Sequence, residues 1–337
     1  MYKYWELIQA MPAAEMTRRM REFEDLGLYG VWVPQLFSPP FPTLAAAAMA
    51  STKLMIGSGV ALAFSRSPVE TALNALDLDR ISGGRMVLGL GTSIRTVNEE
   101  IHGVTYGKPI GHLREVTTMV RAVIEKGHTG KLGRFEGTYC NADLGSLNTG
   151  RAPVRESIPI WLPALFQNTV DLAAKIAEGL LGHPVWSLAT IAQSVARAEQ
   201  LLTANGRKRS DFHVNLWNYA AVASDRQTAV DDMRGTVAFY ASIRQYEKYF
   251  DAHGFGAAAR AASEAAAQHD TAAMTKAIPD EMVRTFAIAG TPDDALERVG
   301  QMARHADSLT LSPPQYFVPA NRLAGYHSAI VDTFYKP

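Results

Sequence analysis

Short apolar runs rich in β-branched and aromatic residues alternate with longer segments whose apolar residues recur at helical spacing. The first pattern predicts buried strands, and the second predicts amphipathic helices. The predicted strands cover residues 4–9, 29–33, 54–64, 86–90, 158–163, 179–182, 212–223 and 308–313. The predicted helices cover residues 15–26, 43–50, 67–79, 113–124, 169–178 and 187–202, and a further helix starts at Thr291.

This regular alternation implies parallel strands joined by right-handed crossovers. Eight strands, most of them followed by a helix, are the number that closes a (β/α)8 barrel. We therefore predict an α/β protein with a TIM barrel, and an open doubly wound sheet is the alternative. Local signals agree, because Gly27 is placed to cap the first helix, and Ser67, Pro68 and Glu70 predict a capping box at the third.

Two segments interrupt the alternation. Residues 127–157 are polar and rich in glycine, which predicts a long loop after helix 4 that can hold a hairpin. Residues 226–285 are too long for one connection and rich in alanine, which predicts a helical insertion before the last strand. This insertion is either a surface feature or a lid over the barrel mouth. We expect a single barrel domain over residues 1–337 that carries both insertions.

Charge and composition narrow the function classes. Lysine plus arginine and aspartate plus glutamate number 33 each, so the basic excess of a nucleic-acid binder is missing. Cys140 is the single cysteine, which excludes an internal disulfide framework. No metal-ligand spacing such as H-E-x-x-H, no signal-peptide pattern and no apolar run of ~18 residues is found. We expect a cytoplasmic protein that binds neither nucleic acid nor membranes.

The stretch RISGGRMVLGLGTS, residues 80–93, places glycines before and after a predicted strand. A dinucleotide-binding turn needs G-x-G-x-x-G, but Ile94 stands where the third glycine belongs. A P-loop is excluded because no Gly-Lys-Ser/Thr follows. The pattern instead predicts a barrel strand whose end, at Gly91, approaches another group closely.

The same stretch closely resembles the fourth-strand signature of the bacterial luciferase-like superfamily of flavin and deazaflavin proteins, L-D-x-L-S-x-G-R-x-x-L-G-x-G. Other stretches match in the same order along nearly the whole chain, among them LGLYGVWVPQLF, KLMIGSGVALAFSRSPVETA, GHLREVTTMVRAVIEKG and IAGTPDDALERV. The resemblance implies a (β/α)8 barrel and a redox enzyme with its cofactor at the C-terminal barrel mouth. VWVPQLF and GHLREV are more similar to the branch that uses the deazaflavin coenzyme F420, so F420 is the expected cofactor and FMN the alternative.

The resemblance also implies which residues contact the cofactor. Its phosphate tail needs hydroxyls or backbone N–H donors, which loops at helix N-termini supply. The matching positions are Gly91, Thr92, Ser93 and Asn98 after the fourth strand, Pro163, Ala164 and Leu165 after the fifth, and Gly182 and His183 after the sixth. Helix capping is the alternative role for Thr92 and Ser93.

Two closely spaced glycines, Gly57 and Gly59, lie inside the third predicted strand and favour a bulge. In F420-binding relatives the matching strand bulges, and a cis peptide there backs the cofactor ring. We therefore predict a bulge at Ser58-Gly59-Val60 that faces the barrel mouth, with a cis Gly59–Val60 bond. A regular strand with a trans bond is the alternative.

The end of the second strand departs from the pattern of similar F420-dependent dehydrogenases. They carry Asp-His, and the histidine takes the proton of the substrate hydroxyl, whereas this chain has Gln35 and Leu36. Leucine cannot accept a proton, and alcohol oxidation needs a general base. We predict a reductase that passes hydride from F420 to a small organic substrate. The catalytic candidates are Gln35, which can bond the cofactor ring or a substrate carbonyl, and His183, at a strand end.

Two other functions stay open at this point. The chain is either an FMN-dependent two-component monooxygenase, supplied by a separate flavin or F420 reductase, or a non-catalytic flavin-binding barrel. The missing Asp-His pair is the reason to keep the second of these open. The resemblance also implies a homodimer.

Overall fold

The computed structural model describes residues 2–36 and 38–336. Internal contacts group them into two compact units. The first unit comprises Trp5–Leu181 and Ala198–His213, and the described part of the second comprises residues 2–4, 182–197 and 214–336. None of the helices in the described residues is long and apolar enough to cross a membrane.

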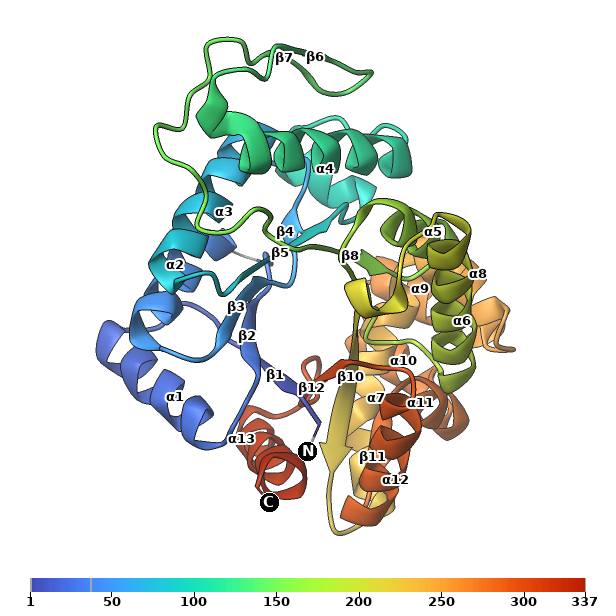
Figure 1. The fold of residues 1–337 in the computed structure, drawn as a ribbon. Helices are drawn as coiled ribbons and strands as arrows, with labels where there is room; N and C mark the ends of the chain where they lie inside the picture. Colours follow the sequence, from blue (N-terminus) through green and yellow to red (C-terminus); the bar gives the residue numbers. More distant parts are fainter. Residues whose placement is uncertain (1, 37, 337) are drawn as a thin grey trace. The chain divides into compact units, whose positions relative to one another are not determined.

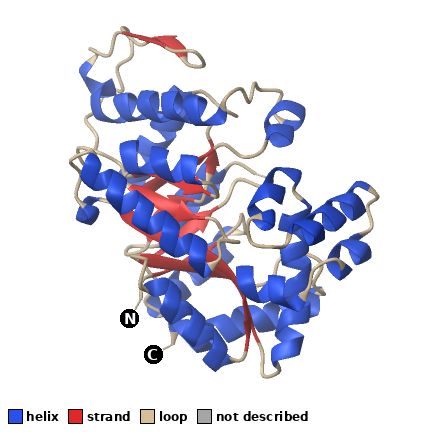
Figure 2. Cartoon of the chain, turned by 90° about the vertical axis from the view of Figure 1, so that its right-hand side faces the viewer, coloured by secondary structure: helices blue, strands red, loops and turns tan. Residues whose placement is uncertain are grey.

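Parallel strands form the sheet of the first unit, in the order β1-β2-β3-β5-β8. They are β1 (Tyr4–Leu7), β2 (Gly30–Val33), β3 (Met55–Ser58), β5 (Met86–Gly91) and β8 (Ile160–Ala164), with a short β4 (Ala61–Leu62) beside β5 and β9 (Gly179–Gly182) after β8. The connecting helices are α1 (Ala13–Asp25), α2 (Pro40–Ala50), α3 (Pro68–Ser82), α4 (Pro109–Lys126) and α5 (Gln167–Ile176). Helices α1 to α4 pack outside these strands (Figure 1), and Figure 2 shows red strands with blue helices around them, so the predicted alternation is confirmed.

Three tryptophan rings form the core of the first unit. Trp5 and Trp32 stack with their centroids 3.9 Å apart, and Trp161 meets them edge-on at 5.8 and 5.5 Å. Glycines make room for these rings, since a Cβ on Gly57 would lie 2.0 Å from Trp32 and one on Gly179 would lie 2.6 Å from Trp161. The packing of Trp32 is therefore a sufficient reason for Gly57.

The strand predicted over residues 54–64 is interrupted where the sequence predicts a bulge. β3 and β4 are separated at the Gly59–Val60 peptide, and this bond is cis, as predicted. Hydrogen bonds from the end of β2 fix the interruption. The Gly59 N–H donates to the Val33 carbonyl at 3.0 Å, and the Gln35 N–H donates to the Val60 carbonyl at 3.2 Å.

The long loop after α4 contains the predicted hairpin, formed by antiparallel β6 (Arg134–Glu136) and β7 (Asn141–Asp143). The hairpin lies beyond α4 in Figure 1. The Glu115 carboxylate of α4 accepts hydrogen bonds from the backbone N–H groups of Tyr139 at 2.7 Å and Cys140 at 3.1 Å. Burial raises the pKa of Glu115, but these bonds outweigh it and leave the pKa below its ordinary value.

Three parallel strands, in the order β11-β10-β12, form the sheet of the second unit. They are β10 (His213–Val222), β11 (Ile288–Gly290) and β12 (Ser308–Ser312). Between β10 and β11 lie α7 (Arg226–Ser242), α8 (Glu247–Asp251), α9 (Gly256–Ala267), α10 (Thr271–Lys276) and α11 (Asp280–Phe286), so the helical insertion is confirmed. The other α-helices of the described residues are α6 (Leu188–Ala204), α12 (Pro292–Ala303) and α13 (Ala320–Ile330).

Some predicted boundaries are wrong. α2 begins at Pro40, earlier than predicted, because a helix tolerates proline in its first turn. Ser67 caps α3 by accepting a bond from the Val69 N–H, without the predicted box. The reciprocal box is made at α12, between Thr291 and Asp294. The short β11 and the C-terminal α13 have no predicted counterpart.

Candidate functional site

The candidate residues of the first unit lie at the carboxyl ends of its strands. Gln35 follows β2, Val60 lies between β3 and β4, Gly91 ends β5, and Pro163 belongs to β8. A Cβ on Gly91 would lie 2.5 Å from Val60 Cγ2 and 2.9 Å from Pro163 Cγ. The structure thus brings Val60, Gly91 and Pro163 together. Side chains of the protein itself make the close approach predicted at Gly91.

The side-chain amide of Gln35 is occupied by hydrogen bonds to the loop after β4. Its Oε1 accepts from the Leu62 N–H at 3.0 Å and from Arg66 Nη2 at 2.9 Å, and its Nε2 donates to Ser65 Oγ at 3.4 Å. These bonds hold the loop against the end of β2. In this geometry Gln35 positions Leu62 and Arg66, and a bond from Gln35 to a ring or substrate stays a prediction.

The loop after β5 is held by side chains from residues that follow it. Thr92 Oγ1 and the Tyr106 hydroxyl both donate to the Ser93 carbonyl, at 3.1 and 3.2 Å. The fully buried Asn98 donates from Nδ2 to the carbonyls of Thr92 and Ile94, each at 2.8 Å. Ser93 adopts a positive φ of 55°. The structure therefore brings Thr92, Ser93 and Asn98 together, and Asn98 fixes the shape of this loop.

The candidates near the ends of β8 and β3 are Ala164, Leu165 and Gly59. Ala164 is buried at the end of β8, and Leu165 is partly exposed in the connection to α5. Gly59 packs against Trp32, and a Cβ there would lie 3.1 Å from that side chain. Packing alone therefore favours a small residue at position 59, as it does at Gly91.

An aromatic stack next to β4 escaped the sequence analysis. The His112 ring lies between Phe64, at 3.7 Å between centroids, and Tyr139, at 4.4 Å. Its Nδ1 lies 3.3 Å from the Tyr106 carbonyl and donates to it, because a carbonyl only accepts. Burial lowers the pKa of His112. These residues are far apart in sequence, and no spacing signal connects them.

In the second unit, His183 lies among tyrosine rings. Tyr240 and Tyr246 meet it edge-on at 5.4 and 5.2 Å. Burial disfavours the charged imidazolium and lowers the pKa of His183 to about 3. Nδ1 accepts from the Val185 N–H at 3.4 Å, so the neutral ring carries its proton on Nε2, 3.2 Å from the Tyr246 hydroxyl. His183 is thus a neutral hydrogen-bond donor with both nitrogens engaged.

Gly182 precedes His183 at the end of β9 and is also closely packed. A Cβ at this position would lie 2.8 Å from Leu216 and 3.0 Å from Trp186. The small residue is required by these side chains, which are both buried.

A second polar cluster joins the start of α6 to the helical insertion. His253 Nδ1 donates to the Tyr249 carbonyl at 2.8 Å, which leaves Nε2 to accept from Ser187 Oγ at 2.9 Å. The Tyr249 hydroxyl donates to the Val185 carbonyl at 2.9 Å. This network anchors α8 to the segment that follows His183, and it had no sequence signal.

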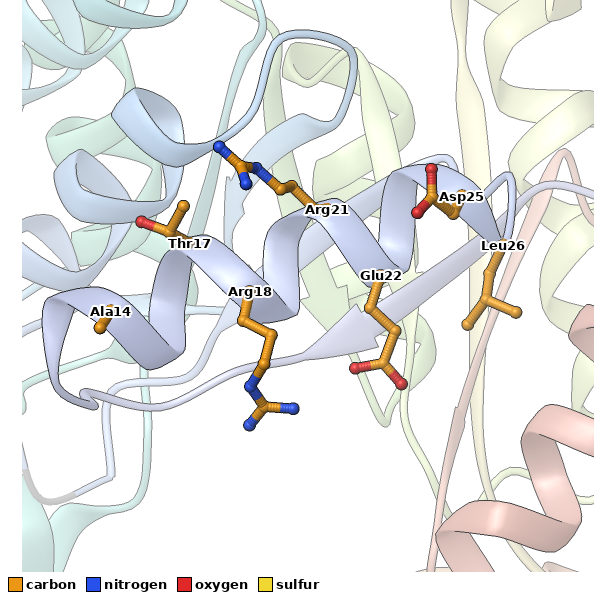
Figure 3. A pocket seen from close by; sticks show the side chains of 7 residues that line it. All are labelled: Ala14, Thr17, Arg18, Arg21, Glu22, Asp25 and Leu26. Atoms are coloured by element: carbon orange, nitrogen blue, oxygen red, sulfur yellow. The ribbon is translucent and has the colours of Figure 1, made fainter.

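A shallow surface pocket on α1 contains none of the candidate residues. Figure 3 shows its lining side chains, which are Ala14, Thr17, Arg18, Arg21, Glu22, Asp25 and Leu26. Two arginines and two carboxylates share this face, and Arg18 and Glu22 point to the same side of the helix. The mixed charge gives no preference for a ligand of either sign.

The strand ends of the first unit fit a flavin-type cofactor in their donor set. Such a cofactor needs an apolar surface for its ring and polar groups for its tail. Val60 would offer the first, and the hydroxyl-bearing loop at Thr92 and Ser93 would offer the second. Asn98 Oδ1 and Trp32 Nε1 are buried polar atoms with no hydrogen-bond partner among the described residues.

Comparison with known families and proteins identifies what the chain is similar to. A profile of the family described as luciferase-like monooxygenase matches residues 4–308. An uncharacterised Mycobacterium tuberculosis protein is 30% identical over 275 residues, which cover 80% of this chain and 81% of that protein. A 5,10-methylenetetrahydromethanopterin reductase of Archaeoglobus fulgidus is 27% identical over 309 residues, 89% of each chain.

Solved structures show the fold. The coenzyme F420-dependent tetrahydromethanopterin reductase of Methanopyrus kandleri superposes with a TM-score of 0.78 at 21% identity, over 93% of this chain and 92% of that one. The oxygenating constituent of 3,6-diketocamphane monooxygenase of Pseudomonas putida, in complex with FMN, superposes with a TM-score of 0.64 at 14% identity, over 99% and 97%. The predicted (β/α)8 TIM barrel is confirmed.

Proposed function

The chain belongs to the luciferase-like monooxygenase family, and from this premise we propose that it is an F420-dependent reductase of a small organic substrate. The family and its oxidoreductase relatives support an enzyme that uses a flavin or a deazaflavin. The methylenetetrahydromethanopterin reductases that match along 88% to 89% of this chain support a reductase, and the superposing reductase that is described as F420-dependent is the reason to prefer the deazaflavin. The observation that carries the direction of reaction is the end of β2, where Gln35 and Leu36 offer no general base.

The residues at the strand ends would hold the cofactor in the first unit. Backbone and hydroxyl groups of Thr92 and Ser93 would bind the phosphate tail, and Asn98 keeps their loop in shape. The Val60 side chain would support the ring. When bound, F420 supplies a hydride that a reductase passes to its substrate.

A reduction is favoured by the groups at the end of β2 that could accept or donate a proton. Leu36 is half exposed and cannot accept a proton, and the amide of Gln35 is neutral and hydrogen-bonded. A reduction needs only a proton donor after hydride transfer, and water can supply it, whereas an oxidation needs a base aimed at the carbinol. The residues at this strand end therefore favour reduction.

An FMN-dependent monooxygenase is the second candidate, because the chain also superposes on an FMN-bound oxygenase. Such an enzyme would receive reduced flavin from a separate reductase. We also propose that the protein forms a homodimer, which light scattering tests directly. A non-catalytic flavin-binding barrel is the remaining alternative.

Cofactor titration tests this proposal. Purified protein is titrated with F420 and, separately, with FMN, and binding is followed by fluorescence. We expect tight binding of F420 and weak or no binding of FMN. The opposite preference would support the monooxygenase, and absence of binding to both would overturn the proposed function.

A further inference from the structure

Arg66 is a partly buried cation at the end of β4. Its guanidinium lies over the ring of buried Phe41, 5.1 Å from the centroid. Burial lowers the pKa of Arg66, and the charge of nearby Glu70 offsets this effect only in part. Within the part of the chain that the structure describes, Arg66 has no ion pair. Its charge is thus partly removed from water, and Glu70 acts on it through space without forming an ion pair.

Three other partly buried arginines of the first and second units pair with carboxylates. Arg155 pairs with Asp79 at 2.6 Å, Arg121 with Glu178 at 2.9 Å, and Arg234 with Asp280 at 2.5 Å. A partly buried guanidinium is costly unless it is paired or hydrogen-bonded. Among the described residues, Arg85, Arg207 and Arg298 also have no ion pair and bond to backbone carbonyls. Arg66 differs from them in lying at a strand end that belongs to the candidate site.

Two neutral groups orient the Arg66 side chain. Gln35 Oε1 accepts from Nη2 at 2.9 Å, and the Leu62 carbonyl accepts from Nη1 at 3.5 Å. A guanidinium carries five N–H donors, so most of them remain for a ligand. An oriented guanidinium with unused donors is well suited to bind carboxylate or phosphate oxygens.

We propose that Arg66, oriented by Gln35, binds an anionic group of the bound cofactor. This inference rests on the proposed function and assigns the charge recognition at that same site to a residue that was not among the candidates. Gln35 is then a positioning residue, and its neutrality matters because a carboxylate in its place would neutralise Arg66. The anion is either the phosphate and carboxylate tail or an ionised oxygen of the ring system.

The test compares four variants with wild type in binding two ligands. The ligands are F420 and its riboside form, which has the same ring but lacks the phosphate and carboxylate tail. Arg66→Gln should weaken F420 binding roughly tenfold to hundredfold, the loss expected for a charge-assisted hydrogen bond. Gln35→Glu should have a similar effect, because it retains an acceptor for Arg66 but cancels the charge. Arg66→Lys should retain most of the binding.

Arg19→Gln is the matched control. Arg19 also lies over a phenylalanine ring, 5.0 Å from the centroid of Phe23, but it has an ion pair with Glu22 at 3.4 Å. This variant removes a cation–aromatic contact outside the candidate site and should leave binding unchanged. Thermal unfolding of every variant separates loss of binding from loss of fold.

The two ligands locate the anion. Weaker binding of F420 alone assigns Arg66 to the tail, and equal weakening of both ligands assigns it to the ring. Unchanged F420 binding by folded Arg66→Gln and Gln35→Glu would overturn the inference while the proposed function stands. If wild type binds neither F420 nor FMN, the proposed function fails as well. If wild type prefers FMN, FMN and riboflavin replace the two ligands in the same comparison.

Discussion

Polar groups at the strand ends of the first unit hold backbone loops, while His183 in the second unit lies among tyrosine rings with both nitrogens engaged. Around Gln35 and Asn98, hydrogen bonds fix the loops and leave donors on Arg66 and an acceptor on Asn98 unused. Around His183, burial has made the side chain neutral. Preorganised groups with unused capacity are suited to bind a ligand, and satisfied neutral groups are suited to hold structure.

The largest expected effect concerns the base that is missing at the end of β2. We expect no measurable oxidation of simple secondary alcohols with oxidised F420, because Leu36 cannot take the hydroxyl proton. Loss of a positioned base typically lowers a rate by ~10²–10⁴-fold. The assay follows alcohol-dependent reduction of F420 by absorbance. Robust turnover would contradict this expectation and would require another base.

The second prediction concerns Gly89 on β5, where the backbone of β3 approaches most closely. A Cβ at this position would lie 2.0 Å from the Ser58 carbonyl oxygen, and backbone cannot move aside as a side chain can. We expect Gly89→Ala to reduce the free energy of unfolding by about 3 kcal/mol, measured in urea. Gly300→Ala on α12 is the control, since nothing lies within 4 Å of its Cβ position. Equal stability of both variants would show that the strand ends are not packed this tightly.

Gly91→Ala tests the same close packing at the end of β5. The added methyl would meet the side chains of Val60 and Pro163 rather than backbone, so we expect a loss of about 1–2 kcal/mol. The sequence alone predicts that this variant weakens cofactor binding more than folding. The contacts in the structure predict that both decrease together. Calorimetric unfolding and cofactor titration of the same variant decide between them.

The fourth prediction concerns Asn98 and the loop after β5. Asn98→Ala removes two hydrogen bonds to loop carbonyls, so stability should fall by about 1–2 kcal/mol and cofactor affinity should fall with it. Asn74→Ala on the surface of α3 removes one bond, to the Glu70 carbonyl, and should change neither property appreciably. Normal affinity in a destabilised Asn98→Ala would mean that the loop does not hold the cofactor.

The last prediction concerns His183 and pH. Its pKa is about 3 in the folded protein and near the ordinary ~6.5 when unfolded, so the unfolded chain binds more protons between these values. The stabilising contribution is complete above pH 6.5 and is lost as the pH falls, by at most about 1.4 kcal/mol per pH unit. Urea unfolding at pH 5, 6, 7 and 8 should show a steeper loss below pH 6.5 in wild type than in His183→Gln. Identical slopes in the two proteins would show that another group causes the loss of stability below pH 6.5.

The strand–helix order and the interrupted third strand were predictable because each depends on local pattern. Apolar runs mark β2 and β5 without reference to any other segment, and the glycines near Val60 mark the break. Other features depend on residues distant in sequence. Gly57 accommodates Trp32 of the neighbouring strand, and no spacing rule distinguishes this from a bulge.

The candidate site was predictable in part for the same reason. The loop residues Thr92 and Ser93 follow a recognisable strand signature. Arg66 was not selected, because its lack of a carboxylate partner becomes visible only when the neighbouring side chains are in place. The stack of His112 between Phe64 and Tyr139 also joins three separate segments.

Hydrogen–deuterium exchange with and without cofactor tests the central claim most directly. If the strand-end loops of the first unit hold the cofactor, F420 should slow exchange of backbone amides in residues 59–66 and 91–98. Exchange in α1, which contributes none of the candidate residues, should stay unchanged. Protection that omits both loops while F420 is bound would contradict the account.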